Sequence, residues 1–150
     1  MSEMFHYTSC GLRNIWLRNG YVVRKTPYGE AVAIHNVEGL HCVIGLYLVR
    51  NKPRLSGAEV RFLRKELDMS QSDLASILGV SENSVRGWEN HRTKITRPAE
   101  RLLRYIFVEH VEGDGKIREL IEKISKINRD AYRKELKLEE TDAGWIAAAA

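Results

Sequence analysis

The chain has few residues of the kinds that mark disulfide scaffolds and membrane proteins. Its 150 residues contain only 2 cysteines and 3 prolines. Two cysteines in a chain of this length do not make a disulfide framework, so we expect both thiols to be reduced. No apolar run approaches the about 20 residues of a membrane span, and the N-terminus MSEMFHYTSC lacks the apolar centre of a signal peptide. These absences predict a globular protein that stays in the cytoplasm.

Motifs of common catalytic sites are also lacking. The sequence has no glycine-rich phosphate loop, no HExxH metal-binding helix and no glycine-flanked serine elbow. Cys10 and one of the histidines at positions 6, 35 and 41 could act as nucleophile and base, but only if folding brings them together. We therefore expect that the protein is not an enzyme.

Residues 70–89, in contrast, have the periodicity of two short helices joined by a tight turn. Apolar residues recur at helical spacing after Ser70 and again after Ser81, and serine is a good N-cap. Gly79 lies between them and can take the left-handed conformation in which helices often end. The two helices would share a small core of Leu74, Ala75, Leu78, Val80, Val85 and Trp88. This is the pattern of a helix-turn-helix, whose second helix lies in the DNA major groove.

The second of these helices has mostly short polar residues outside the core. Asn pairs bidentately with adenine and Arg with guanine, so Asn83 and Arg86 are the best candidates for reading bases. Glu82 would accept a hydrogen bond from cytosine or reject wrong sequences beside the phosphates. Gly87 would let the helix sit close to the groove. The full candidate set for base contacts is Glu82, Asn83, Ser84, Arg86 and Gly87.

Positive charge is concentrated around this motif. Residues 50–110 contain 12 Lys and Arg against 8 Asp and Glu, which accounts for the whole net charge of +4. The loop HRTKITR follows the second helix and places Arg92, Lys94 and Arg97 where they would neutralise DNA phosphates. The alternative interpretation is an ordinary solvated loop.

The order S-Q-x-x-L-A-x-x-L-G-V-S-x-x-x-V-x-x-W-E over residues 70–89 resembles the Cro and phage-repressor (XRE) helix-turn-helix family. The resemblance implies that Gln71 binds a phosphate and that residues near the start of the second helix read bases. It also implies that Glu89 supports the fold through a hydrogen bond or ion pair, and that Asn90 contacts a phosphate.

Further helices are expected on both sides of the motif. Ser56 is placed to cap an upstream helix, and Pro98 to begin a downstream one. The inward-facing residues would be Val60, Phe62, Leu63 and Leu67 upstream, and Leu102, Leu103, Ile106 and Phe107 downstream. Four helices between about residues 56 and 110 make a small domain of ordinary size.

The first 50 residues predict a small β-rich unit with turns at 27–29 and 36–39. They resemble the N-terminal zinc-binding domain of the MqsA (YgiT-type) antitoxins, in which two C-x-x-C pairs bind one zinc ahead of an XRE-like domain. The resemblance rests on the short motif Gly-Leu-His-Cys at residues 39–42. It places Tyr7 and Cys10 at the first pair, and Cys42 and Gly45 at the second.

Half of that zinc site is missing. Zinc needs four ligands, and only Cys10 and Cys42 remain of the thiolates, so no metal or other cofactor is expected. A site that combines these two cysteines with a histidine is the alternative. Without metal, we expect Trp16, Tyr21 and Tyr47 to build the core of this unit.

Beyond Gly113 and Gly115, residues from Lys116 to about Leu136 predict an amphipathic helix. Its apolar stripe either covers the helical domain, which we favour, or pairs with another subunit. The tail KLEETDAGWIAAAA is expected to be mobile. The stripe consists of Ile117, Leu120, Ile121, Ile124 and Ile127.

Together these features predict an α+β protein in three parts. They are a β-rich, degenerate zinc-ribbon domain at 1–50, an XRE-type helix-turn-helix domain at 51–111, and an amphipathic helix with its tail at 112–150. The expected function is a sequence-specific regulator, a repressor, that binds double-stranded DNA as a homodimer, because paired half-sites multiply specificity. The alternative is a type II antitoxin that binds a toxin through its N-terminal domain and autoregulates its operon.

Overall fold

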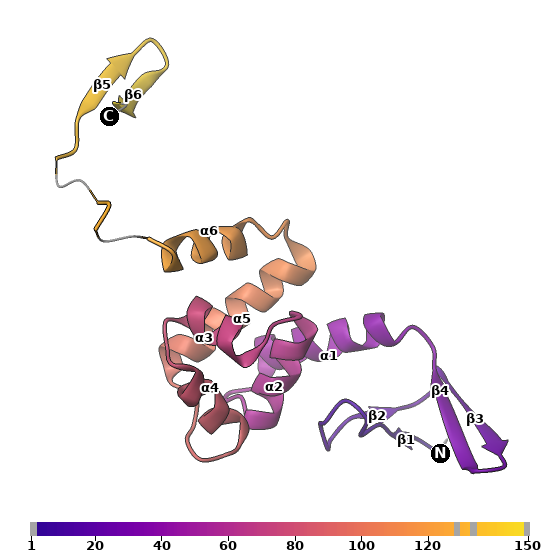
Figure 1. The fold of residues 1–150 in the computed structure, drawn as a ribbon. Helices are drawn as coiled ribbons and strands as arrows, with labels where there is room; N and C mark the ends of the chain where they lie inside the picture. Colours follow the sequence, from indigo (N-terminus) through magenta and orange to yellow (C-terminus); the bar gives the residue numbers. More distant parts are fainter. Residues whose placement is uncertain (1–2, 128–129, 133–134, 149–150) are drawn as a thin grey trace.

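The computed structural model describes residues 3–127, 130–132 and 135–148. Across these ranges, short N-terminal strands are followed by six helices and a C-terminal hairpin (Figure 1). This is the α+β layout that the sequence predicts. Within the described ranges, no helix combines the length and the apolar character that crossing a membrane would require.

The N-terminal strands form two small antiparallel sheets. Strand β1 (Phe5–His6) pairs with β2 (Trp16–Leu17), and β3 (Tyr21–Thr26) pairs with β4 (Gly29–Ile34). The turn predicted at 27–29 is confirmed. There the Thr26 hydroxyl donates to the Gly29 carbonyl at 2.7 Å and accepts from the Tyr28 N–H at 3.2 Å. Gly29 has φ +116°, a conformation that favours glycine.

The second predicted turn, at 36–39, is instead the start of a helix. Helix α1 (Val37–Asn51) begins at Asn36, whose side chain accepts a hydrogen bond from the Gly39 N–H at 3.2 Å. A short apolar run such as CVIGLYLV does not distinguish strand from helix by its periodicity. The N-terminal third therefore holds a 15-residue helix besides its strands.

Helix α1 packs closely against α5 (Arg97–Glu112). At Gly45 the two helices approach so closely that a Cβ atom would overlap the ring of Phe107. Arg104 of α5 donates to the carbonyl oxygens of Val49 and Lys52 at 3.0 and 2.6 Å, which satisfies acceptors at the end of α1. The boundary drawn at residues 50 and 51 thus falls at the end of a helix that shares the central core.

The four predicted helices of the central domain are present. Helix α2 (Gly57–Glu66) and α3 (Gln71–Leu78) each begin with a capping box, and α4 (Glu82–Glu89) begins at Ser81, whose side chain accepts from the Ser84 N–H. Gly79 ends α3 with φ +70°. The helices enclose one core, whose fully buried members include Leu63, Leu74, Val85, Leu103, Ile106 and Phe107.

The C-terminal part differs from its prediction in two ways. Helix α6 (Lys116–Ser125) ends well before residue 136, although part of the predicted span lies outside the described residues. The tail that was expected to be mobile contains a hairpin of β5 (Leu138–Thr141) and β6 (Gly144–Ala147). Its last two residues are not described. The α6 stripe covers the core only in part, because Ile121 packs against it while Leu120, Ile124 and Ile127 are exposed.

The expected aromatic core of the N-terminal unit is wrong for two of its three members. Trp16 and Tyr47 are exposed, and Tyr21 is half-buried. Trp16 instead stacks on the ring of His6, with centroids 4.0 Å apart. The side chains that join the central core from this unit are Tyr7, Leu12 and Leu17, followed by Ile44, Leu48 and Val49 of α1.

Candidate nucleic-acid interface

The outer face of α4 carries a connected set of exposed polar side chains. Glu82, Asn83 and Arg86 are all exposed. Arg86 donates to the Asn83 side-chain oxygen at 2.9 Å and to the Glu82 carboxylate at 3.2 Å. The guanidinium and the amide that were predicted to read bases are therefore adjacent on one surface. Both groups have the donors and acceptors that base edges in the major groove require.

The other two base-reading candidates lie differently. Ser84 is half-buried, and its hydroxyl is 2.9 Å from that of Ser81 within the helix cap. Gly87 is buried, and its carbonyl accepts from the N–H groups of Arg92 and Thr93. A Cβ at Gly87 would lie 3.3 Å from the Thr93 hydroxyl. Gly87 thus faces its own loop and not the exposed surface on which it was expected.

A buried ion pair holds α4 in place from behind. Arg64 of α2 donates through two nitrogens to the two carboxylate oxygens of Glu89, at 2.8 and 2.9 Å. A third nitrogen donates to the Met69 carbonyl at 2.9 Å. The Arg64 and Glu89 side chains are only 12% and 4% exposed. Glu89 therefore has the supporting role that the resemblance of residues 70–89 to the XRE family implies.

Gln71, at the start of α3, joins this support. Its amide nitrogen donates to the Glu89 carboxylate at 3.3 Å. A primary amide has two N–H donors, so the second is left for a phosphate. In the same turn, Ser70 lowers the pKa of Asp73. The larger effect comes from the hydrogen bond of its backbone N–H, and the smaller one from its hydroxyl. Gln71 thus supports α4 through Glu89, and its predicted phosphate contact is compatible with this role.

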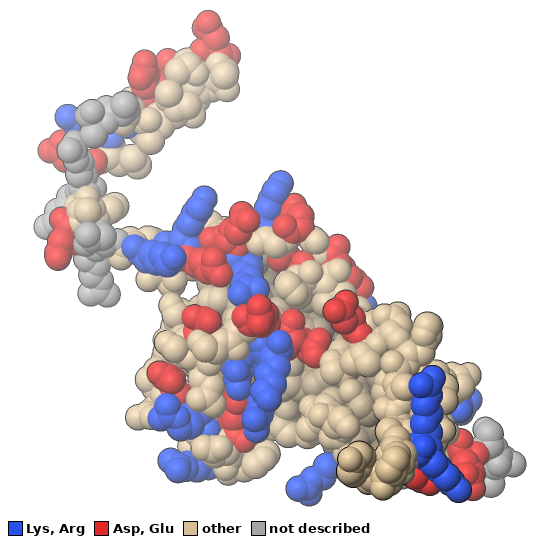
Figure 2. Space-filling model, turned by 45° about the vertical axis from the view of Figure 1, so that its right-hand side comes forward, with Lys and Arg blue, Asp and Glu red and all other residues tan. Residues whose placement is uncertain are grey.

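The remaining phosphate-contact candidates lie on and beside the loop after α4. Asn90, Arg92, Lys94 and Arg97 are all exposed. Within the described part of the chain, none of the three cations, Arg92, Lys94 and Arg97, has an ion-pair partner. Figure 2 shows Lys and Arg side chains projecting from the lower edge of the helical body. These charges are available to neutralise phosphates.

The loop itself is fixed by groups that the sequence analysis did not single out. Ile95 is buried, and Arg54 donates to its carbonyl at 2.6 Å. The Arg54 guanidinium also lies 3.5 Å from the buried carboxylate of Glu100. Arg54 and Arg64 thus use their charges to hold the interface in place. Their sequence signal is weak, because nothing local distinguishes an arginine that bonds to the protein's own groups from one that faces solvent.

Residues 60–99 match the model of a protein family described as helix-turn-helix. The match begins within α2 and ends in the first turn of α5, so it includes all of α3, α4 and the following loop. The chain carries an XRE-type, DNA-binding helix-turn-helix domain. None of the curated proteins and none of the solved structures compared with the chain matches it. The likeness of residues 1–50 to MqsA antitoxins thus stays a resemblance.

The residues ahead of the helix-turn-helix domain do not fit the zinc site of that resemblance. Gly45, at the place of one cysteine, lies against the Phe107 ring in the core. Tyr7, at the place of another, has its hydroxyl 2.8 Å from Nε2 of His41. In the described ranges, His, Cys, Asp and Glu side chains form no group of three or more that could hold a metal ion. Cys10 and Cys42 are both half-buried free thiols.

A chain of hydrogen bonds occupies this region instead. Nδ1 of His41 lies 2.7 Å from the Glu66 carboxylate at the end of α2. Because a carboxylate only accepts, Nδ1 donates to Glu66, and Nε2 forms a hydrogen bond with the Tyr7 hydroxyl. Burial raises the pKa of Tyr7, and the charges of Cys10 and Glu66 raise it further. The three side chains connect the N-terminal unit to the helix-turn-helix domain.

Proposed function

We propose that the protein is a sequence-specific transcriptional repressor that binds double-stranded DNA as a homodimer. One observation carries this proposal. The exposed Asn83 and Arg86 lie together on a helix that the buried Arg64–Glu89 pair holds from behind. Base-reading groups must be held precisely to discriminate between base pairs, and a rigid support supplies that precision.

The hydrogen bonds around Arg86 favour specific over nonspecific binding. In the free protein its guanidinium is directed by Asn83 and Glu82. A base that offers acceptors in the matching places can replace these partners without net loss. A base that does not leaves the desolvated polar groups unpaired, which costs about 1–3 kcal/mol. The side chains therefore penalise wrong bases as well as bind correct ones.

The small size of one α4 surface supports a homodimer. A single α4 helix reads only a few base pairs, whereas two copies on a palindrome read twice as many. Occupation of DNA by such a dimer is enough to block a promoter, so repression needs no further surface. We propose that it acts in the cytoplasm, without catalysis and without a cofactor.

Selection of bound sequences from a random duplex pool by the full-length protein tests this proposal. At about physiological salt, nonspecific binding is weak, so enrichment reports base recognition. We expect a palindromic motif, with half-sites about one helical turn apart or a multiple of it. A single unpaired half-site would contradict the homodimer. A folded protein that enriches no motif would contradict sequence-specific regulation itself.

A second candidate function is that of a type II antitoxin. The β3–β4 hairpin favours it, because Val22, Val23 and Val32 are exposed and Tyr28 at its tip is fully exposed. Exposed apolar side chains on a projecting hairpin are typical of protein-binding surfaces. The test is whether a gene next to this one arrests growth, and whether this chain relieves the arrest. Val23→Thr with Val32→Thr, which changes a cross-strand pair on one face of the hairpin, should abolish the relief and leave DNA binding unchanged.

A further inference from the structure

A polar cavity of about 830 Å³ lies between the N-terminal loop and the helix-turn-helix domain. One wall is residues 9–14, which connect β1 to β2, and the other is α2 together with the end of α4. Arg13 comes from the first wall, Arg61 and Lys65 come from α2, and His91 follows α4. The cavity thus lies between two segments that are about 40 residues apart in the sequence.

The exposed charges of this cavity are all positive. Arg13, Arg61 and Lys65 are exposed, and within the described residues none of them has an ion-pair partner. The two acidic residues that line it are Glu59 and Glu89, whose side chains are both about 4% exposed. Their charges are matched by Lys52 and Arg64. The cavity therefore presents an uncompensated positive surface to whatever approaches it.

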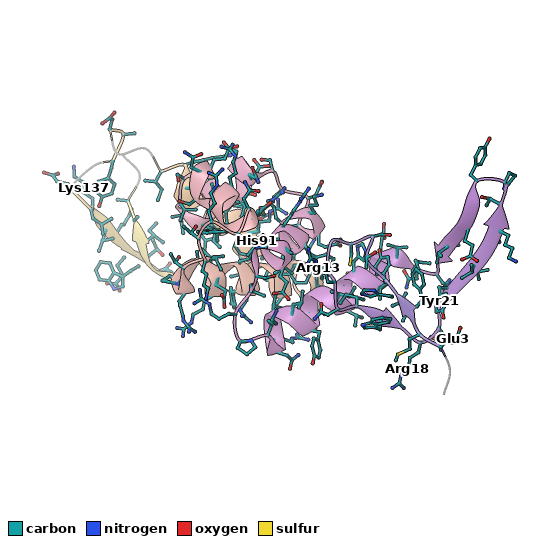
Figure 3. The ribbon with its side chains drawn as sticks, turned by 90° about the horizontal axis from the view of Figure 1, so that it is seen from below. Glu3, Arg13, Arg18, Tyr21, His91 and Lys137 are labelled. Atoms are coloured by element: carbon teal, nitrogen blue, oxygen red, sulfur yellow. The ribbon has the colours of Figure 1, made fainter. Side chains whose placement is uncertain are left out.

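This surface is continuous with the predicted phosphate contacts. His91 and Ser56 also line a second, neighbouring cavity whose wall includes Arg92 and Lys94. On the other side, Glu89 accepts a hydrogen bond from Gln71. Figure 3 shows Arg13 and His91 beside one another near the middle of the molecule. The basic cavity therefore adjoins the loop that carries the proposed phosphate contacts Arg92 and Lys94.

The loop that carries Arg13 is fixed to the core. Leu12 is only 3% exposed, and the Tyr7 N–H donates to the Ile15 carbonyl at 2.9 Å. The Arg13 carbonyl accepts a hydrogen bond from His6. The backbone is thus held in place while the Arg13 side chain stays exposed. A charge on an ordered loop loses less entropy on binding than one on a flexible arm.

We propose that this surface of Arg13, Arg61 and Lys65 binds the phosphate backbone of DNA beside the sequence that α4 reads. The inference rests on the proposed DNA-binding function and extends it to the N-terminal unit. A small-molecule ligand fits the cavity less well, because such sites are mostly apolar and bury most of their ligand. A row of exposed arginines and lysines instead suits a repeating chain of phosphates.

The experiment compares two duplexes that carry the sequence selected from the random pool. The short duplex ends at the outermost specified base pair, and the long one continues on both sides for about 10 base pairs, one helical turn. The affinity for each duplex is measured as a function of salt concentration for the wild-type protein and for Arg13→Gln. Arg18→Gln is the matched control, because Arg18 is an exposed arginine of the same unit that lies farther from His91 in Figure 3.

On the long duplex, Arg13→Gln should reduce the slope of log K against log salt by about 0.9, the value for one phosphate contact. Arg61→Gln with Lys65→Gln should reduce it by about twice as much. On the short duplex the slopes of all variants should equal that of the wild type. Arg18→Gln should change neither slope.

Equal slopes for wild type and Arg13→Gln on the long duplex would overturn the inference and leave the proposed function intact. Equal reductions on both duplexes would also overturn it, since the contact would then lie within the specified site. Failure of the proposed function has a different signature, because the wild type itself would then show no preference for the selected sequence. Thermal unfolding of each variant checks that it is folded.

Discussion

Arg64 of α2 and Glu89 of α4 form a bidentate ion pair, with nitrogen to oxygen distances of 2.8 and 2.9 Å. Both side chains are almost completely buried, so the pair has little contact with water. Each residue is tolerated in the interior only because the other neutralises its charge, since a buried charge without a partner is strongly destabilising. The orientation of α4 thus depends on the Arg64–Glu89 pair, which does not lie on the exposed face of this helix.

Removal of one partner should therefore be costly. Arg64→Met should lower the free energy of unfolding by about 3–5 kcal/mol, because it leaves the Glu89 charge buried without an opposite charge and with only the Gln71 amide as a partner. Urea unfolding measures the loss. In the double variant Arg64→Met with Glu89→Met most of it should be recovered, since no unpaired charge remains. As a control, Arg50→Met removes an exposed partner of Glu112 and should cost less than about 1 kcal/mol. Equal losses at both arginines would contradict the assigned role.

The contact of Gly45 with Phe107 leads to a second prediction. Gly45→Ala should destabilise the protein by about 1–3 kcal/mol in urea unfolding, because the new methyl group overlaps the ring. Alanine is otherwise the better helix former by about 1 kcal/mol, so a net loss has to come from packing.

Two further variants test that origin. Phe107→Leu should reduce the cost of Gly45→Ala, which a double-mutant cycle measures directly. Val43→Ala on the exposed side of α1 should stay within about 0.5 kcal/mol of the wild type. A stabilised Gly45→Ala protein would show that the two helices move apart at little cost.

The exposed face of α4 should determine which sequence is bound. Asn83→Ala or Arg86→Ala should relax specificity at particular base pairs by about 1–3 kcal/mol, because each loses a base contact. Lys94→Ala should weaken specific and random DNA about equally and reduce the salt slope by about 0.9. Binding to a panel of single-base variants of the selected duplex distinguishes the two effects. Similar losses on specific and random DNA for all three variants would rule out the assigned base-reading roles.

Tyr7 should make stability depend on pH in the alkaline range. Burial, with the charges of Cys10 and Glu66, raises its pKa in the folded protein, whereas an unfolded tyrosine has a pKa of about 10. Above that pH the native state holds a proton that the unfolded state has lost, so stability falls as pH rises. Its contribution is complete below about pH 10.

Urea unfolding at about pH 8 and about pH 11, on either side of the tyrosine pKa, measures this effect. Between these values the wild type should lose more stability than Tyr7→Phe, which has no proton to release. Tyr28→Phe is the control, because Tyr28 is fully exposed and should follow the wild type. If Tyr7→Phe and the wild type lose the same amount, Tyr7 does not titrate in this way.

The helix-turn-helix domain could be predicted because its signals are local. A serine cap fixes a helix start within one turn, and Gly79 fixes a helix end through its own φ angle. The same applies to the hairpin turn at 27–29. A comparable signal was present in the tail, where Thr141 and Gly144 repeat the turn of Thr26 and Gly29 with the same side-chain hydrogen bonds. That repeat would have predicted the C-terminal hairpin.

Other features could not be predicted from local signals. The apolar run in α1 suits a strand or a helix equally, and contact with α5 across about 60 residues of sequence decides between them. Gly87 was expected on the polar face of α4, but it is buried, because the loop that follows α4 folds back onto it. Trp16 and Tyr47 are large aromatic residues, yet other side chains, Tyr7 and Phe107 among them, fill the core and leave these two exposed.

The sequence by itself determined where the central helices begin, that Asn83 and Arg86 of α4 face outward, and where positive charge accumulates. These properties depend on residues within a few positions of one another, so no knowledge of the fold is needed to infer them. Only the tertiary structure decided that Arg64 supports the interface from within and that Arg13 joins it from another part of the chain. A buried ion pair and a shared cavity depend on which distant side chains meet, and that follows from the packing of the whole core.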